Sequence, residues 1–441
     1  MKGQHAFYLF FVYIILQGAF RKWLFPSLGT FIYLFQFVLA FAFYFSSKPK
    51  NSLNKYEVKP AFLSLLMLYL GFAVLQMLNF RGTDIFFVQI YGLVMHFAFI
   101  PMIFHVPRVL ESEEKFDKTI NWLTYILIGV FTIGIIQFFS SPGSFINKYA
   151  TDQEAGTYEI VLGGGGRVRI AGTFSYLATY ASFLAFVLHL LLYGLFSSVI
   201  KNKFKPIFLI AYAMGFINIF MTGSRGPVGY YVITEGLTVL ILLSSGQFKF
   251  LNKLIPIGIS LSIVYIIIIS TSAGSTALGD FMYRFQNSND LGTRINLLPF
   301  LDDEVDLIGY GLGTAQPAMG GYLSNRNEMP LYWEVEYERI TLEMGIFGYI
   351  LIMILRYIVF YTCYTIAKKV KKLEFKILAL QMTMFQVPFL LNLQTNIYNY
   401  IDGMFYWIAI GIVYFAYYID LKYNAEQDKL EPTPTALYRW D

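Results

Sequence analysis

The sequence predicts an all-α integral membrane protein whose chain crosses the bilayer about twelve times. Two observations predict this class. The 441 residues are 56% hydrophobic and only 14% charged, whereas a soluble domain carries roughly 25% charged residues. Apolar runs of about 20 residues, the length that a helix needs to cross the hydrocarbon layer, also recur along the whole chain. We therefore interpret residues 1–441 as a single transmembrane domain.

The expected spans follow one another at short intervals, with two exceptions. The first apolar run has no small-residue cleavage site after it, so we interpret it as a retained span rather than a signal peptide. The connections 140–173 and 272–339 are longer than ordinary connectors, which is typical of functional or disordered loops. The second mixes aromatic and charged residues, which predicts a large folded external loop between helices 9 and 10. The expected spans lie near residues 6–20, 28–45, 61–79, 85–104, 120–139, 174–199, 206–222, 228–243, 254–271, 340–367, 377–391 and 404–418.

The distribution of basic residues gives the predicted spans an orientation. One set of alternate loops carries 21 of the 33 Lys and Arg residues and the opposite set carries 11. By the positive-inside rule the richer set, which includes both termini, is cytoplasmic. For this reason the net charge of +5 indicates orientation rather than nucleic-acid binding. The single cysteine, Cys363, excludes a disulfide within the chain.

The two faces also differ in which basic residue they use. The cytoplasmic loops hold 19 Lys and 2 Arg, whereas the external loops hold 9 Arg and 2 Lys. A guanidinium offers a planar fork to phosphate or carboxylate, which an ammonium does not. We therefore expect the outer face to bind an anion such as a lipid-linked phosphate. The alternative is that the outer arginines pair with acids of the loops.

Two arginine motifs stand at the outer edge of predicted spans. Arg167 and Arg169 follow the glycine run 163–166, and the second motif is the turn 223–226, Gly-Ser-Arg-Gly, which contains Arg225. An arginine beside hydroxyls and exposed backbone amides can hold a phosphate. The alternatives are a flexible hinge for the glycine run and a membrane-interface anchor for Arg225.

The large external loop contains further candidates. Arg284 and Arg294 precede an acidic run at 302–306 and a glycine-rich stretch at 309–313. Carboxylates are ligands for divalent cations, but cation sites usually recruit them from separate elements, so a solvated loop is the favoured interpretation of the acidic run. Without a His or Cys cluster the sequence predicts no metal site.

The segment 334–348 is predicted to be a helix that enters the bilayer. Helical spacing places Glu334, Glu338 and Gly345 near one face and turns Glu336 away. A carboxylate buried at the membrane boundary can serve as a general base, because burial raises its pKa. The alternative is that these glutamates only pair with Arg339 and with Arg326.

Taken in order, these motifs resemble the O-antigen ligase and Wzy-type polymerase superfamily of bacterial envelope glycosyltransferases. The resemblance covers roughly residues 160–400, and the remainder agrees in topology only. One departure is clear, because Glu334 stands where ligases carry a histidine and Val335 where a polar residue is usual; none of the four histidines lies in the large loop. The matching residues are Arg169 with Gly172 to Phe174, Gly223 to Gly226, Gly309 to Gly313, and Tyr337, Glu343, Gly345 and Gly348.

The resemblance implies a GT-C-like, metal-independent polymerase without a cofactor that uses an undecaprenyl-diphosphate-linked oligosaccharide. It implies that Glu334, or else Glu336 or Glu338, deprotonates the acceptor sugar hydroxyl. External arginines would hold the diphosphate and stabilise charge on the leaving group, and aromatic residues such as Tyr337 would stack on sugar rings. The expected substrate-binding residues are Arg169, Arg225, Arg294, Arg167, Arg284, Arg339 and Tyr337.

Three alternative functions stay open at this stage. Within the superfamily, a ligase would move a finished glycan onto a lipid or another acceptor, but the missing histidine favours the polymerase. A flippase or other transporter would show related halves and ionisable residues at mid-membrane, for which Arg356 is the main candidate. A scaffold would leave the external arginines unexplained. The expected location is the bacterial cytoplasmic (inner) membrane, with membrane lipids and chain-length regulator or flippase proteins as partners.

Overall fold

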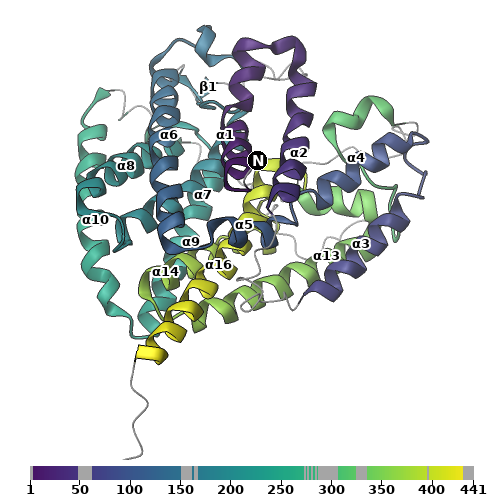
Figure 1. Cartoon of the computed structure of the whole chain (residues 1–441). Coiled ribbons are helices and arrows are strands. Elements are labelled where there is room, and N and C mark those ends of the chain that lie inside the picture. Colours follow the sequence, from purple (N-terminus) through teal and green to yellow (C-terminus); the bar gives the residue numbers. More distant parts are fainter. Residues whose placement is uncertain are drawn as a thin grey trace, which may run out of the picture.

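The protein is a bundle of helices that run in several directions around a buried central pair (Figure 1). The computed structural model describes residues 3–47, 62–149, 161–162, 167–272, 306–323, 335–394 and 397–430, with isolated positions between 275 and 286. The main helices are α1 Gly3–Ala19, α2 Gly29–Ser46, α3 Leu63–Gln76, α4 Phe86–Phe97, α5 Met102–Leu110, α6 Glu113–Phe139, α7 Leu177–Phe196, α8 Lys205–Met221, α9 Arg225–Ser244, α10 Leu251–Ile269, α13 Glu336–Lys369, α14 Leu373–Met384, α15 Val387–Leu390 and α16 Tyr400–Leu430.

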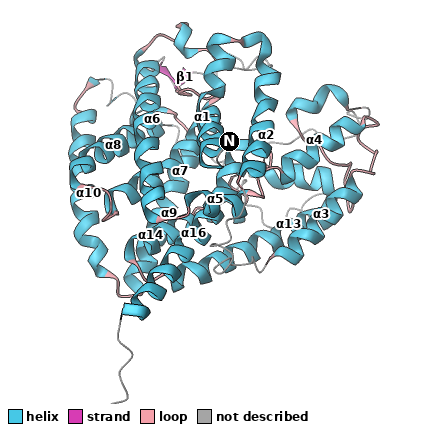
Figure 2. Cartoon of the chain, viewed as in Figure 1, coloured by secondary structure: helices cyan, strands magenta, loops and turns pink. Residues whose placement is uncertain are grey.

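Short elements connect these helices. The only strands among the described residues, β1 (Val161–Leu162) and β2 (Arg167–Val168), pair antiparallel, with Val161 opposite Val168 (Figure 2). This small ladder lies in the external loop 140–173 and is the one departure from the all-α prediction in the described chain. The other elements are the π-helix η1 Phe20–Leu24 and the 3-10 turns η2 Pro26–Leu28, η4 Phe145–Asn147, η7 Asn202–Phe204, η8 Phe248–Phe250 and η10 Pro317–Tyr322.

Eight described helical segments are long and apolar enough to cross a membrane, which confirms a multi-pass membrane protein. Helices α4 and α5 meet the same criteria together but are bent by 45°, as in a broken span or a re-entrant loop. The eight segments are Gly3–Leu24, Pro26–Ser46, Glu113–Phe139, Leu177–Phe196, Asn202–Met221, Arg225–Ser244, Glu336–Lys369 and Tyr400–Asn424.

The remaining expected spans, near 61–79, 254–271 and 377–391, coincide with α3, α10 and the α14–α15 pair, none of which counts among the eight. Helix α3 has only 14 residues. Helix α14 ends at Met384, and Pro388 at the start of α15 has no N–H to continue the ladder of hydrogen bonds. The number twelve therefore stays a prediction.

Helix α13 departs most from the expected continuous span. Gly345 adopts φ +67°, ψ −171° inside it, so two helices meet at this residue. An ion pair shows how sharp the bend is: Glu336 Oε2 lies 2.8 Å from Arg356 Nη2. In a straight helix, 20 residues would separate these two positions by about 30 Å. The first two turns of α13 therefore fold back beside the longer segment.

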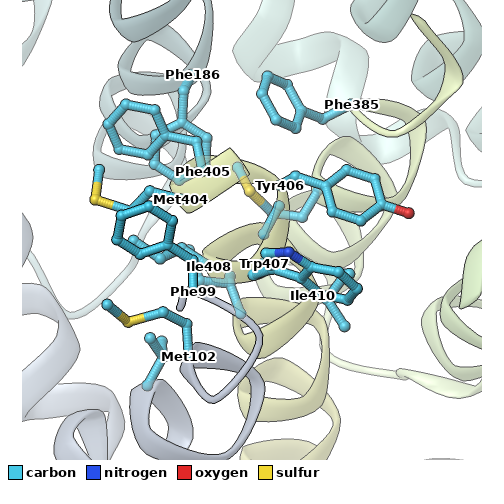
Figure 3. Packing of buried hydrophobic residues seen from close by; sticks show 14 of the residues in the cluster. Phe99, Met102, Phe186, Phe385, Met404, Phe405, Tyr406, Trp407, Ile408 and Ile410 are labelled. Atoms are coloured by element: carbon cyan, nitrogen blue, oxygen red, sulfur yellow. The ribbon is translucent and has the colours of Figure 1, made fainter. Parts of the chain in front are cut away.

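The core is centred on α7 and α16. In their most apolar windows 89% and 83% of the residues are buried, against 22% for α9, because α7 is apolar on every side, as expected for an interior helix. Phe186 of α7 stacks on Phe405 of α16 with a centroid distance of 4.3 Å, and Phe99 and Met102 approach α16 from the α4–α5 bend (Figure 3). Helix α10 lies at one edge of the bundle and α3, α4 and α13 at the opposite edge (Figure 1).

Candidate functional site

The two arginine motifs meet in space, although more than 50 residues separate them in the chain. The Arg169 guanidinium donates from Nε to the Thr222 carbonyl at 3.1 Å and from Nη2 to Ser224 Oγ at 3.2 Å. The backbone N–H of Ile170 donates to the Met221 carbonyl at 3.3 Å. Residues 169–175, which we call the arginine loop, therefore pack directly on the turn that precedes Arg225.

The arginine loop is held in place by side chains from two other helices. Gly172 has φ +53°, and a Cβ there would lie 2.8 Å from the Tyr180 ring, so the position requires glycine. Its carbonyl accepts from Lys22 Nζ at 2.7 Å and from Gln137 Nε2 at 3.1 Å. Gln137 Oε1 in turn accepts from the Gly172 N–H at 2.8 Å. These contacts hold the arginine loop in one conformation, as a flexible hinge would not be held.

Arg225 is the first residue of α9 and is half-buried. It follows Ser224 at the N-cap position, where unpaired N–H groups and the helix dipole favour an anion. The preceding Gly223 has φ +63°, which allows the tight turn between α8 and α9. One turn further along α9, the Tyr230 hydroxyl donates to the Leu393 carbonyl. Arg225 and Arg169 thus lie on adjoining elements at the same end of α9.

A third arginine, Arg21 at the end of α1, borders the arginine loop. Its Nη1 donates to Ser175 Oγ at 3.1 Å, and its guanidinium lies 5.6 Å from the centroid of the Tyr33 ring. The Tyr33 ring makes an edge contact with Tyr400, with a centroid distance of 5.3 Å. The charge count predicts that Arg21 lies on the outer face, but no motif surrounds it, so nothing in the sequence joins it to Arg169.

The glycine-rich stretch 309–313 pairs with the break in α13. The N–H groups of Tyr310 and Gly311 donate to the carbonyls of Leu342 and Glu343 at 2.7 and 3.1 Å, and the Ile346 N–H donates to the Asp306 carbonyl at 3.1 Å. These bonds satisfy groups that the bend at Gly345 releases from the helix. A Cβ at Gly345 would lie 2.3 Å from the Leu307 carbonyl oxygen. We call residues 306–316 and 342–347 the kink pairing.

Glu343 anchors the kink pairing through a buried histidine that sequence reasoning did not connect with it. Its Oε2 lies 2.8 Å from His96 Nε2, and both side chains are fully buried. The second ring nitrogen of His96 pairs with the Tyr69 hydroxyl. Glu343 Oε1 accepts from the Ala315 N–H at 3.2 Å. His96 comes from α4, far from the motif in sequence, and no local spacing could have indicated the contact.

Asp306 holds the outer end of the kink pairing. Its carboxylate accepts from Arg81 Nη1 at 2.6 Å and from the N–H groups of Ile308 and Gly309 at 2.9 and 3.1 Å. Partial burial acts to raise the pKa of Asp306, but these three donors together bring that pKa below its usual value. Asp306 is the one member of the acidic run 302–306 that lies within the described residues. In that part of the chain, no group of three His, Cys, Asp or Glu side chains could hold a metal ion.

The three glutamates predicted as candidate bases differ in their surroundings. Glu334, the first choice, lies outside the described residues. Glu336 is fully buried, and besides its ion pair with Arg356 it accepts from the Ile397 N–H at 2.9 Å. A carboxylate that is neutralised and hydrogen-bonded in this way is poorly placed to accept a proton from a substrate. Glu338, two residues further along α13, is half-buried.

Some of the other predicted residues lie within the described part of the chain and some lie outside it. Tyr337 is buried, and Arg339 is half-buried with its guanidinium 5.4 Å from the Tyr398 ring centroid. Arg167 contributes its backbone to β2, and nothing describes its side chain. Arg284 and Arg294 lie outside the described residues, as do Arg326, Tyr332 and Trp333. Arg356, the main candidate for a transporter's charged group, is occupied by Glu336 and by the Phe389 carbonyl at 3.3 Å.

The segment 397–400, just before α16, connects the two halves of the site. Its Ile397 N–H binds Glu336, and its Tyr398 ring contacts both Arg339 and, at 6.1 Å between centroids, His96. Tyr400 contacts the Tyr33 ring that Arg21 covers. The hydroxyls of both tyrosines are buried and have no hydrogen-bond partner within the described residues. Neither tyrosine was predicted, because both lie in a short connection that resembles no motif.

The candidate site therefore consists of Arg21, Arg169 and Arg225 on one side of the segment 397–400 and of Arg339, Glu336 and Glu338 on the other. Comparison of the chain with models of known protein families gives no match, and no curated protein is similar to it. The chemistry that the site supports therefore follows from the groups present in it. Three arginines beside hydroxyls, backbone N–H groups and tyrosine rings can bind an anionic ligand that carries ring-shaped, hydroxylated parts.

Proposed function

We propose that this protein is a membrane glycosyltransferase that polymerises polyisoprenoid-diphosphate-linked oligosaccharide repeats at the outer face of the bacterial cytoplasmic membrane. The observation that carries the proposal is the contact between the Arg169 guanidinium and the turn that leads into Arg225. Both arginines belong to motifs that resemble the O-antigen polymerase and ligase superfamily, and the second pair of such motifs forms the kink pairing. These two contacts between motifs that are distant in sequence support the proposal.

The proposed topology has twelve spans, cytoplasmic termini and a GT-C-like arrangement with the loop 272–339 outside. In this topology α1, α3, α6 and α8 end at the external face, and α2, α4, α7, α9, α13 and α16 begin there. On this topology Arg21, Arg81, Arg169, Arg225 and Arg339 all lie outside.

In the proposed reaction the acceptor sugar hydroxyl attacks the anomeric carbon of the donor, and the lipid diphosphate leaves. Arg169, Arg225 and Arg294 hold the diphosphate and offset the charge that builds on its leaving oxygen. Glu334 accepts the proton of the attacking hydroxyl, with Glu338 as the second candidate, since Glu336 is committed to Arg356. The bond to the leaving oxygen breaks as the new glycosidic bond forms, and no metal or cofactor takes part.

Two other functions remain as alternatives. A ligase uses the same donor but a different acceptor, and the same arginines serve it equally well. A glycan-lipid flippase or transporter would require a charged group free to bind cargo at mid-membrane, and the ion pair of Arg356 with Glu336 disfavours Arg356 for that purpose.

The decisive experiment replaces Arg225 by Ala or Glu334 by Gln in cells and resolves the surface glycan by chain length. A polymerase predicts that single capped repeats accumulate, whereas a ligase predicts lipid-linked polymer with none attached. Arg108→Ala, in α5 and among the basic residues assigned to the cytoplasmic face, is the matched control and leaves long chains intact. Intact long chains from both site variants, at normal membrane levels of the protein, would exclude the proposed enzyme.

A second experiment tests the absence of a metal from the reaction. Purified protein is expected to consume the lipid-diphosphate-linked repeat in the presence of EDTA at an unchanged rate. Activity that depends on added Mg²⁺ would overturn the metal-independent mechanism and would point to the acidic run 302–306 as a cation site.

A further inference from the structure

Three polar side chains from three different helices meet inside the bundle, away from the candidate site. His189 lies in the second half of α7, Glu235 near the middle of α9 and Gln381 in α14. None belongs to a motif that the proposed function uses. An ionisable group within a membrane span is costly to bury and is retained most often because it has a function.

The three side chains form one hydrogen-bonded cluster. His189 Nδ1 lies 2.6 Å from Glu235 Oε1. Gln381 Nε2 donates to Oε1 and Oε2 of the same carboxylate at 2.8 and 3.0 Å. The Tyr231 ring stacks on the imidazole with a centroid distance of 4.9 Å, and its hydroxyl pairs with that of Tyr212. Among the described residues no lysine or arginine forms an ion pair with Glu235.

The charge of this cluster depends on a single proton. With Glu235 ionised and His189 neutral, the cluster carries one negative charge that no cation balances. One proton taken from water makes the cluster neutral overall, whether it resides on the imidazole or on the carboxylate, because the 2.6 Å contact joins the two. A lone charge in an apolar interior is strongly unfavourable, so this one proton decides whether an uncompensated charge lies inside the bundle.

The surroundings leave room for a change of protonation. His189 Nε2, Gln381 Oε1 and Thr234 Oγ1 are buried and have no hydrogen-bond partner in the described part of the chain. The Glu235 side chain is 20% exposed whereas that of His189 is fully buried, so the carboxylate is the more accessible of the two groups.

We propose that Glu235 and His189 form an intramembrane proton-binding site whose ligand is a single proton exchanged with water. The site is connected to the outer face by α9 itself. The same helix carries Arg225 at its start and Tyr230, whose hydroxyl binds the Leu393 carbonyl in the connection that follows α15. Gln381 lies one short helix before that connection. A change in charge at Glu235 thus acts on two elements, α9 and α14, that both lead to the candidate site.

Tyr231 of α9 belongs to the same cluster, because its hydroxyl interacts with Glu235 as well as with Tyr212 of α8. Two carboxylates on the neighbouring helices have other partners. Asp117 of α6 accepts from Tyr193 and Ser197 at 3.0 Å each. Glu374, at the start of α14, accepts from Ser198 at 3.1 Å. Glu374 is therefore a suitable control carboxylate, since it is also buried and on a helix of the same cluster.

The test is infrared difference spectroscopy of the purified full chain in lipid nanodiscs between about pH 5 and about pH 8, the range in which a histidine pair exchanges protons. The wild type is expected to show the carbonyl-stretch change of a carboxylic acid that gains or loses its proton. Glu235→Gln removes this band, and Glu374→Gln retains it. A Glu235→Gln spectrum identical to that of the wild type would overturn the proposal.

A second variant covers the case in which Glu235→Gln does not fold. Gln381→Leu keeps both Glu235 and His189 but removes two donors to the carboxylate. The Glu235 band is then expected to change frequency, because the hydrogen bonds to its oxygens change. A band that stays at the wild-type frequency would show that it arises from another carboxyl group and would contradict the proposal.

Discussion

The arginine loop and the kink pairing both join segments that are far apart in the chain, but they do so in different ways. At the centre of the kink pairing, Glu343 and His96 are fully buried and contact each other. In the arginine loop, Arg169 and Arg225 are only half-buried. A closed region contributes mainly to stability, whereas half-buried cationic groups on a fixed backbone can also reach a ligand. We therefore assign scaffolding to the kink pairing and binding to the arginine loop.

The largest effect is expected from His96→Phe, which tests the scaffolding side of the comparison. The substitution leaves Glu343 buried without its partner, and breaking a buried pair from one side costs about 3–5 kcal/mol. The measurement is thermal or denaturant unfolding of the purified protein in detergent.

Tyr69→Phe is the matched control for His96→Phe. It removes only the hydroxyl that pairs with the other ring nitrogen and leaves the His96–Glu343 contact in place. A loss of about 1 kcal/mol is expected, as for one hydrogen bond. Equal losses from the two variants would contradict the central role of the pair.

A smaller effect, on activity rather than stability, is expected from Arg169→Lys. The guanidinium donates to the Thr222 carbonyl and Ser224 Oγ from two different nitrogens, a geometry that one ammonium cannot reproduce. On the proposed function, turnover of the lipid-linked repeat falls about 100-fold, the loss typical of one misplaced charge-stabilising donor. The free energy of unfolding changes by about 1 kcal/mol or less.

Arg108→Lys provides the same substitution at a residue of α5 assigned to the cytoplasmic face and is expected to leave turnover unchanged. If Arg169→Lys unfolds the protein as readily as His96→Phe, the distinction between a binding loop and a scaffold fails. If it leaves turnover intact, the loop does not bind the donor.

Hydrophobic periodicity predicts much of the fold but little of its bends. All twelve expected spans coincide with helices or helix pairs, because the length of an apolar run follows directly from the sequence. The break at Gly345 was not predicted, since a glycine in an apolar run does not reveal that its φ is positive. Nor did the sequence indicate that Pro101 and Pro107 accompany a 45° bend between α4 and α5.

Arg169 and Arg225 were predicted as site residues because they stand in recognisable local patterns, whereas Arg21 and the partners of these arginines were not. Counting charges by loop predicts that the arginines lie on the outer face, and that sidedness stays a prediction. His96, Lys22 and Tyr398 stand in no pattern, because each reaches the site from an element distant in sequence. Tertiary contacts of this kind depend on how the helices pack against one another. A short stretch of sequence does not reveal that packing.

The smallest effect on stability is expected from Asp306→Asn, at the exposed edge of the kink pairing. Three donors lower the pKa of Asp306 below the value of about 3.9 that an unfolded aspartate has. The carboxylate therefore stabilises the fold fully above that value, and the contribution is lost as the pH falls through the lower pKa of the folded state. The Arg81 side chain is 50% exposed, so the contribution is only about 0.5 kcal/mol.

The test compares the free energy of unfolding of the wild type with that of Asp306→Asn at about pH 6 and about pH 3. The two values are expected to differ by this amount at the higher pH and to converge at the lower. A difference that grows as the pH falls would contradict the sign of the shift and would mean that the outer edge of the kink pairing is held by contacts other than the Asp306 carboxylate.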